Sequence, residues 1–354
     1  MIIVSKIWEE FQMLRFLIAA VTGMLATFAI ADPVEDFYRN KTIRIVVGMN
    51  PPDQHDNDAR ALSRYMGKYL PGNPSLIVQN MPGAGSLKAV QFLATVGERD
   101  GSMIGIAQRG MMMMPLLGYT DAKFDPTKFS WIGTRAGETS IAAMWHQSAT
   151  RSFEDATRRE TITPSTGGGA DSITLPAIYN ETLGTKFKVI TGYSGGGDMN
   201  LALERGEADG RVGWSVGAMR GTKEDWFRDK KLNIILQHGL RPNPVLPGVP
   251  LAQNLAKNEA DRQLLELFAA RQEIGFPVFG PPGIPADRVK ALRAAYQKTM
   301  QDPAYVNEVK LMNVELDPLT GEEMQALVDK IYSYSPEVVS RAREILAKAG
   351  AIPK

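Results

Sequence analysis

Loops rich in glycine, serine and aspartate could bind an anion through their backbones. Each follows an apolar segment and precedes a helical pattern; they cover residues 49–56, 80–86, 165–172 and 193–198. The N-terminus of a helix exposes unpaired N–H groups and carries roughly half a positive charge. Glycine lets a ligand approach this backbone closely. Several such helix ends that converge on one cleft would therefore hold a carboxylate without arginine.

The second of these loops suits an anion best. It reads Pro82-Gly83-Ala84-Gly85-Ser86, so its N–H groups and the Ser86 hydroxyl could together hold a carboxylate. Taken alone, such a loop is more often a plain turn between a strand and a helix. Because the pattern recurs in both halves of the chain, we favour a binding site.

One segment matches a catalytic motif. Gly213-Trp214-Ser215-Val216-Gly217 has the G-x-S-x-G pattern that places a serine nucleophile between a strand and a helix. That chemistry needs an acid and then a histidine, and His238 follows too closely for the intervening elements. We therefore expect no enzyme and interpret Ser215 as a hydroxyl donor in a cleft or at its hinge. A periplasmic serine hydrolase that uses Ser215 is the alternative.

Other side chains have a structural and a functional interpretation. Trp214 could pack on a ligand or in the core. Arg109 follows a strand predicted over residues 103–106 and could clamp a carboxylate, although we favour a loop charge exposed to solvent. The methionines 111–114 are expected to form a buried helix start. We assign three further tryptophans to the core: Trp131, Trp145 and Trp226.

The composition excludes several classes of protein. The 354 residues include no cysteine, and the three histidines, His55, His146 and His238, lie far apart, so no metal and no organic cofactor are expected. A net charge of +1 provides no strong field toward nucleic acid or membrane. The length indicates about two domains.

Strands that alternate with helices must position the loops. Short strands are predicted at residues 42–48, 76–78, 161–163 and 188–191, and each is followed by a loop and an amphipathic helix. Asp56 or Asn57 is expected to cap the first of these helices. Such an α/β pattern favours mostly parallel sheets, in which ligands bind outside the carboxyl ends of the strands. Two loops in each half of the chain predict two lobes that face one cleft.

The final third of the chain is expected to be a helical scaffold. One helix is predicted over residues 286–300. A second opens with the capping box Thr320-Gly321-Glu322-Glu323, and a third opens at Ser335-Pro336 and ends at Gly350.

The N-terminus predicts export. Lys6 and Arg15 precede an apolar run over residues 16–30, which ends in the small-x-small pattern Ala29-Ile30-Ala31. The run is shorter than the ~20 apolar residues that a membrane span needs. We expect a signal peptide over residues 1–31, cleaved near Ala31, and a periplasmic mature protein.

A set of ordered segments resembles a known family. They are the strand 43–48, Asn80 to Ser86, Asp100-Gly101-Ser102, Tyr193-Ser194-Gly195-Gly196, Gly206 to Gly210, Leu246 to Pro250 and Gly280 to Pro285. From about Asp36 to the C-terminus, the chain thereby resembles the extracytoplasmic solute-binding proteins of tripartite tricarboxylate transporters, the Bug or TctC family.

This resemblance implies a type II periplasmic-binding-protein fold, with two α/β lobes, a hinge and an interlobe cleft. The lobes would comprise residues 33–134 with 241–354, and residues 135–240. In the first lobe, the resemblance implies ligand contacts from Asn50, Gln54, His55, Asp56 and the loop Pro82 to Ser86. In the second lobe it points to Thr166, Gly167, Gly168, Asp171, Tyr193, Ser194, Gly195 and Asp209.

The first loop departs from the family. The family reads Pro-Gly-Gly-Gly-x-Asp, and this chain reads Pro51-Pro52-Asp53-Gln54-His55-Asp56. Pro52 has no N–H group, and Asp53 adds a negative charge where the family binds an anion. We expect this carboxylate cradle to be lost, reshaped, or adapted to a ligand with a neutral or cationic end.

These features predict a monomeric solute-binding protein. It would capture a small organic anion, a carboxylate, by closing its lobes and would pass it to the membrane permease of a tripartite transporter. A ligand-sensing receptor of the same fold is an alternative, because transport and signalling need the same binding module.

Overall fold

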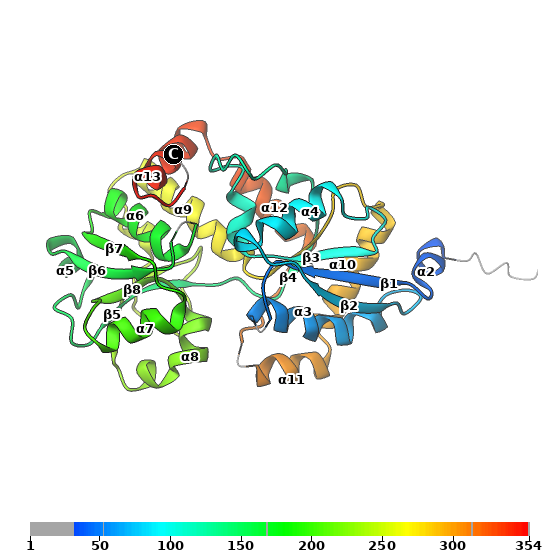
Figure 1. The fold of residues 1–354 in the computed structure, drawn as a ribbon, viewed down its shortest axis with the longest axis horizontal. Coiled ribbons are helices and arrows are strands. Elements are labelled where there is room, and N and C mark those ends of the chain that lie inside the picture. The colour runs from blue at the N-terminus through cyan, green and yellow to red at the C-terminus, as the bar shows by residue number, and fades with distance from the viewer. Residues whose placement is uncertain (1–31, 52, 168, 313, 353–354) are drawn as a thin grey trace, which may run out of the picture.

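The computed structural model describes residues 32–352 except residues 52, 168 and 313. Figure 1 shows two lobes, each built from strands flanked by helices. The expected signal peptide and Gly168 lie outside the described residues. Within the described part of the chain, no helix combines the length and the apolar character needed to cross a membrane.

The first lobe is built on a mixed sheet with the strand order β11-β4-β10-β3-β1-β2. β1 (Thr42–Val47) pairs in parallel with β2 (Ser75–Asn80) and with β3 (Met103–Ile106). β10 (Pro277–Gly280) runs antiparallel to β3 and to β4 (Ser130–Thr134), and β11 (Leu319–Thr320) closes the edge beside β4.

Helices cover both faces of this sheet. Successive residues of a strand point to opposite faces, so Ile45 of β1 packs with Leu62 and Leu292, whereas Val46 packs with Leu93. The first face carries α3 (Gln54–Tyr65) and α10 (Ala286–Met300), and the second carries α4 (Leu87–Thr95) and α12 (Gly321–Tyr332). The remaining helices of this lobe are α2 (Pro33–Tyr38) and α11 (Pro303–Leu311). The predicted helix over residues 286–300 is therefore confirmed as α10.

The second lobe differs from the predicted parallel arrangement. β5 (Ser140–Trp145) lies between β8 (Gly210–Ser215) and β9 (Leu232–His238), and both pair with it antiparallel. β6 (Thr161–Ser165) and β7 (Phe187–Thr191) form a separate parallel pair. The prediction from alternating strands and helices therefore holds for β1 to β3 and for β6 with β7. It fails for β5, β8 and β9.

Helices also flank the second lobe, and the C-terminal segment reaches it. Its own helices are α5 (Phe153–Arg158), α6 (Asp171–Leu183), α7 (Gly196–Glu204) and α8 (Val216–Arg228). α9 (Glu259–Ile274) and α13 (Pro336–Lys348) both contact α6, and α9 also contacts α12 of the first lobe. This part of the chain therefore lies along the seam between the lobes (Figure 1).

Short 3-10 helices connect several of these elements. They are η1 (Met66–Tyr69), η2 (Ala84–Ser86), η3 (Arg109–Met113), η4 (Pro126–Lys128) and η5 (Ala252–Leu255). Met111, Met112 and Met113 are buried at η3, and the tryptophans assigned to the core are buried as well. The capping box at Thr320 and Glu323 is present.

The cap of α3 is not where the sequence suggested. Asp53 precedes the helix, and its Oδ1 accepts a hydrogen bond from the His55 N–H at 2.9 Å. Asp56 and Asn57 already lie inside the helix, because α3 begins at Gln54. A carboxylate of the chain itself therefore occupies this helix N-terminus.

Candidate ligand-binding cleft

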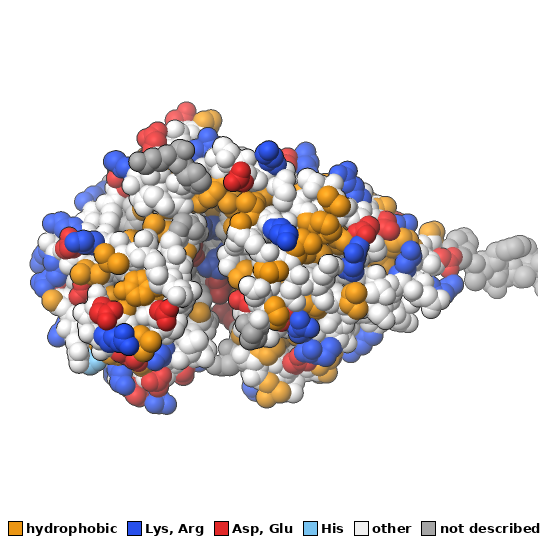
Figure 2. Space-filling view, viewed as in Figure 1, with side chains coloured by type: hydrophobic (Ala, Val, Ile, Leu, Met, Phe, Trp, Pro, Cys, Tyr) orange, Lys and Arg blue, Asp and Glu red, His pale blue; other side chains and the backbone are white. Residues whose placement is uncertain are grey.

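The lobes face each other across connected hollows. A central chamber of about 280 Å³ is lined by loops of both lobes, including His55, Arg109, Asp171, Arg211 and Ser215. It shares Gln108, Gly110 and Arg271 with a Met111 chamber of about 470 Å³. It shares His55 and Ala218 with a Phe276 chamber of about 360 Å³. Figure 2 shows the groove between the lobes, with basic and acidic side chains deep within it.

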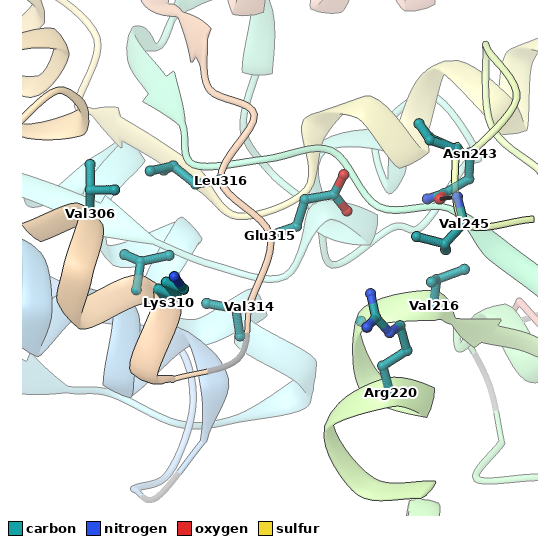
Figure 3. Close-up of a pocket in the computed structure, with 12 residues that line it drawn as sticks. Val216, Arg220, Asn243, Val245, Val306, Lys310, Val314, Glu315 and Leu316 are labelled. Atoms are coloured by element: carbon teal, nitrogen blue, oxygen red, sulfur yellow. Dashed lines mark hydrogen bonds between the residues drawn. The ribbon is translucent and has the colours of Figure 1, made fainter. Parts of the chain in front are cut away.

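A further hollow of about 420 Å³ extends the same seam. Figure 3 shows its two walls, with Val306, Lys310 and Val314 on one side and Val216 and Arg220 on the other. It shares Gly217, Val314 and Glu315 with the Phe276 chamber. None of the site residues predicted from the sequence lines this hollow, so the chemistry of the cleft lies toward the central chamber.

Arg109 bridges the two lobes and does not face solvent. Its Nη1 forms an ion pair with Glu138, and its Nη2 lies 2.7 Å from Oδ2 of Asp171. The side chain is only 18% exposed. The interpretation as a solvated loop charge is therefore wrong, because the turn after β3 directs this side chain between carboxylates of other segments.

Asp171 is the carboxylate at the centre of this network. It lies in the first turn of α6, where a negative charge is favoured by the helix dipole. It also forms an ion pair with Arg271 of α9, and Nε2 of Gln272 donates a hydrogen bond to its Oδ2 at 3.2 Å. Asp171 lines the central chamber, and its charge is balanced by these arginines.

Arg211 of β8 has a different environment. Its guanidinium carbon lies 4.1 Å from the centre of the Trp214 ring, and its Nη1 donates to Oδ1 of Asn200 at 2.6 Å and to the Gly196 carbonyl at 3.3 Å. The residue is 8% exposed, and burial lowers the pKa of its guanidinium to about 9. Among the described residues, no carboxylate lies within ion-pair distance of Arg211.

The central chamber therefore has an excess of positive charge. Three arginines line it, Arg109, Arg211 and Arg271, against Asp171 in the lining and Glu138, which pairs with Arg109. Walls of low dielectric strengthen such a field, and a small anion would be drawn into the chamber.

The loop from Pro82 to Ser86 only partly meets its prediction. Ala84 and Gly85 line the Met111 chamber, whereas Pro82 and Gly83 line none of these hollows. The Ser86 hydroxyl is fully buried; it donates to the Gly48 carbonyl at 3.3 Å and accepts from the Gln108 N–H at 3.2 Å. In this structure the hydroxyl joins the ends of β1 and β3, and its role as a ligand donor stays a prediction.

The first loop presents two of its four predicted residues to the cleft. Gln54 lines the Phe276 chamber, and His55 lines both this and the central chamber. Asp56 is buried between Arg60 and Asn80, whose nitrogens each lie 2.8 Å from its carboxylate. It therefore ties α3 to β2 and does not line these hollows. Asn50 is exposed outside them.

The predicted residues of the second lobe divide in the same way. Thr166 lines the Met111 chamber, and the Gly167 N–H donates to Oγ of Ser165 at 3.1 Å. Asp209 accepts hydrogen bonds from Oγ of Ser148 at 2.9 Å and from the Ile162 N–H at 2.8 Å, so it holds β6 in place. Asp209 does not line these hollows, and its contact with a ligand stays a prediction. Four further predicted residues do not line these hollows: Gly167, Tyr193, Ser194 and Gly195.

Ser215 is a helix cap at the wall of the central chamber. Its Oγ accepts a hydrogen bond from the Ala218 N–H at 3.1 Å, and its backbone, with φ of −70° and ψ of 144°, lacks the strain of a nucleophile elbow. His238 is fully buried on β9, and β5 separates that strand from β8. The arrangement therefore keeps His238 from acting as a catalytic base for Ser215, and Trp214 beside the serine packs on Arg211. In the described part of the chain, no cluster of acidic side chains and histidines is arranged to hold a metal ion.

Sequence reasoning missed two arginines. Arg271 lies in α9 among buried apolar residues such as Leu264, Phe268 and Ile274, and a charge at such a position signals a buried partner. Arg211 lies in an otherwise apolar strand three residues before Trp214. Nothing in the sequence indicated that both face the same chamber.

Solved structures share this architecture. A TctC solute-binding protein from Polaromonas has a TM-score of 0.65 and 18% identity, with 88% of this chain and 99% of that chain covered. The periplasmic binding protein BugD has a TM-score of 0.60 and 21% identity, with 90% and 100% covered. MatC from Rhodopseudomonas palustris, solved with bound malate, has a TM-score of 0.60 and 18% identity, with 86% and 99% covered.

The fold and the cleft define the class: the chain has the two-lobed α/β fold of periplasmic binding proteins. Within that class, its fold is that of the TctC and Bug solute-binding proteins, as the resemblance predicted. No protein-family model matches the sequence, and no curated protein does so either.

Proposed function

We propose that this chain is an exported solute-binding protein that captures a small organic carboxylate between its lobes. The observation that carries the proposal is the excess of arginine over acid in the central chamber, with Arg109 and Arg211 contributed by different lobes. An anion that bridges both lobes would stabilise the closed cleft. The fold shared with TctC and Bug proteins supports the same function, and MatC was solved with bound malate.

The proposal extends to the cellular setting. The chain is cleaved near Ala31, acts as a monomer in the periplasm, and delivers its ligand to the membrane permease of a tripartite transporter. Its lobes comprise residues 33–134 with 241–354, and residues 135–240. The apolar run before Asp32 and the shared fold support export and transport.

Reversible binding is sufficient for the proposed function, and no catalytic step is required. A ligand with micromolar affinity requires about −8 kcal/mol, which a few charge-assisted hydrogen bonds and lobe closure supply. No bond of the ligand is broken in this scheme, and the proposal assigns no catalytic role to Ser215.

Calorimetry on the mature chain tests this function. We expect exothermic binding of one carboxylate per chain from a panel of mono-, di- and tricarboxylates, aromatic acids and amino acids. Small-angle scattering should show a smaller radius of gyration in the complex, because the lobes close. Ester hydrolysis without binding of any carboxylate would contradict the proposal.

A further inference from the structure

Arg211 and Asp53 lie on different walls of the cleft. The wall with Arg211 favours a negative charge on the ligand, and the wall with Asp53 disfavours one. Resting on the function proposed above, we propose that the ligand places one carboxylate on Arg211 and turns a neutral or cationic end toward Asp53. The chain would then select monocarboxylates over dicarboxylates of the same length.

Arg211 is held ready for an anion. Trp214 supports one face of its guanidinium, and Asn200 and Gly196 accept hydrogen bonds from Nη1 alone. Among the described residues, Nε and Nη2 have no hydrogen-bond acceptor, although the residue is only 8% exposed. A planar fork fixed in this way matches a carboxylate with little loss of conformational entropy.

The surroundings of Arg211 favour the binding of an anion. The N-terminus of α7 lies beside it, since a Cβ at Gly196 would be 3.7 Å from both Nη atoms. No side chain caps this helix end. The acid in its first turn, Asp198, is exposed and forms no ion pair with Arg211 in the described structure. The helix dipole therefore adds to the charge of the arginine.

The other arginines of the chamber are already neutralised. Arg109 pairs with Glu138 and Asp171, and Arg271 pairs with Asp171. A ligand carboxylate would have to displace those partners, whereas Arg211 has no carboxylate partner among the described residues. The site is therefore assigned to Arg211 rather than to the three arginines together.

Asp53 gives the opposite wall a negative charge. Its Oδ1 accepts hydrogen bonds from the His55 N–H at 2.9 Å and from Nδ1 of His55 at 2.8 Å. Burial opposes ionisation, but these hydrogen bonds outweigh it and lower the pKa of the Asp53 carboxyl. The Asp53 carboxylate thus occupies the N-terminus of α3, where the helix dipole would otherwise favour a ligand anion.

The space near Asp53 suits an uncharged group. Asp53 lines the Phe276 chamber together with the apolar Phe276 and Met312, the acids Glu138 and Glu315, and Arg135, which pairs with Asp58. A second ligand carboxylate there would meet the carboxyl groups of Asp53, Glu138 and Glu315 in a partly desolvated space. Because the charge of Arg135 is offset by Asp58, placing that carboxylate there costs free energy. This chamber shares His55 and Ala218 with the central one, so the two hollows give the proposed ligand a path from Arg211 toward Asp53.

Matched pairs of acids test the proposal. The probes are butyrate with succinate, hexanoate with adipate, and benzoate with terephthalate, titrated into wild type, Arg211→Gln, Asp53→Asn and the control Arg228→Gln. Arg228 is 70% exposed on α8, so the control removes an arginine outside the cleft. Asparagine also caps helices well, so Asp53→Asn keeps α3 intact while it removes the charge.

We expect wild type to bind the monoacid of its preferred pair about tenfold more tightly than the diacid. Arg211→Gln should lose at least about tenfold in affinity for both acids, and Asp53→Asn should gain affinity for the diacid selectively. Equal affinity of wild type for both members, or unchanged affinity in folded Arg211→Gln, would overturn the inference alone. Failure of wild type to bind any acid would overturn the proposed function. If Arg211→Gln does not fold, the wild-type pairs and Asp53→Asn still decide the question.

Discussion

His238 is a histidine without contact with solvent. It is the last residue of β9, its exposure is 0%, and the Tyr179 ring lies edge-on at 5.7 Å. Burial lowers the pKa of the imidazole to about 3, and the nearby backbone of Phe268 opposes this only weakly. The folded protein therefore keeps the ring neutral well below the usual pKa of a histidine.

This histidine makes folding sensitive to acid. Below an unfolded pKa of about 6.5 the unfolded chain binds a proton at His238 that the folded chain does not, so stability falls as the pH drops from about 6.5 toward 3. The slope is about 1.4 kcal/mol per pH unit. Between pH 7 and pH 5, the free energy of unfolding of His238→Gln should therefore fall by about 2 kcal/mol less than that of wild type, as measured by urea denaturation. Identical losses in the two proteins would disprove this role.

Gly275 marks a close approach between elements. It follows α9 with φ of +52°, and a Cβ at this position would lie within 1.8 Å of the Ala136 carbonyl oxygen. Ala136 belongs to the segment that leads from β4 to β5. The end of α9 thus packs backbone against backbone on a connection between the lobes, which only glycine permits.

Gly275→Ala should destabilise the fold by about 3 kcal/mol or more, because it combines backbone strain with a clash. Gly350→Ala is the matched control, since Gly350 has φ of +68° but no atom within 4 Å of its added Cβ. The control should lose only about 1–2 kcal/mol, the cost of the left-handed backbone. Urea midpoints measure both, and equal losses would show that the contact with Ala136 is unimportant.

The whole molecule is joined across its seam by the network around Asp171. Arg109 extends from the first lobe, Asp171 begins α6 of the second, and Arg271 comes from α9 between them. Arg271 is 3% exposed, so it cannot recover hydration if its partner is removed. The network therefore ties the relative position of the lobes to the stability of the chain.

Asp171→Asn tests this link. It leaves the buried Arg271 without its counter-charge and Arg109 with Glu138 alone, and should cost about 3–5 kcal/mol, seen as a lower Tm in calorimetry. Glu160→Gln breaks the exposed pair with Lys188, in which the Glu160 side chain is 61% exposed, and should cost less than about 1 kcal/mol. A loss for Asp171→Asn as small as that of the control would rule out a structural role of the network.

The local pattern of the sequence was sufficient for most elements. Alternating apolar residues predicted β1, a short apolar segment before a loop predicted β7, and the caps at Thr320 and Ser335 predicted α12 and α13. These features depend on neighbours within a few residues, so periodicity and capping chemistry reveal them. The ordered family segments predicted the two-lobed fold, which the solved structures share. The direction of β5, β8 and β9 was missed, because strand pairing depends on distant partners.

The composition of the loops was not sufficient to predict the candidate site, because the site depends on tertiary structure. Ser86 and Asp209 have the right residue types, yet their oxygens are used by the backbones of distant segments. Arg211 and Arg271 lie sixty residues apart in elements that look structural, and the fold brings both to one chamber. The sequence by itself therefore determined the elements, the two-lobed fold and the unusual Asp53 loop. Only the tertiary structure decided which polar groups remain available to a ligand, because that depends on partners that meet when the chain folds.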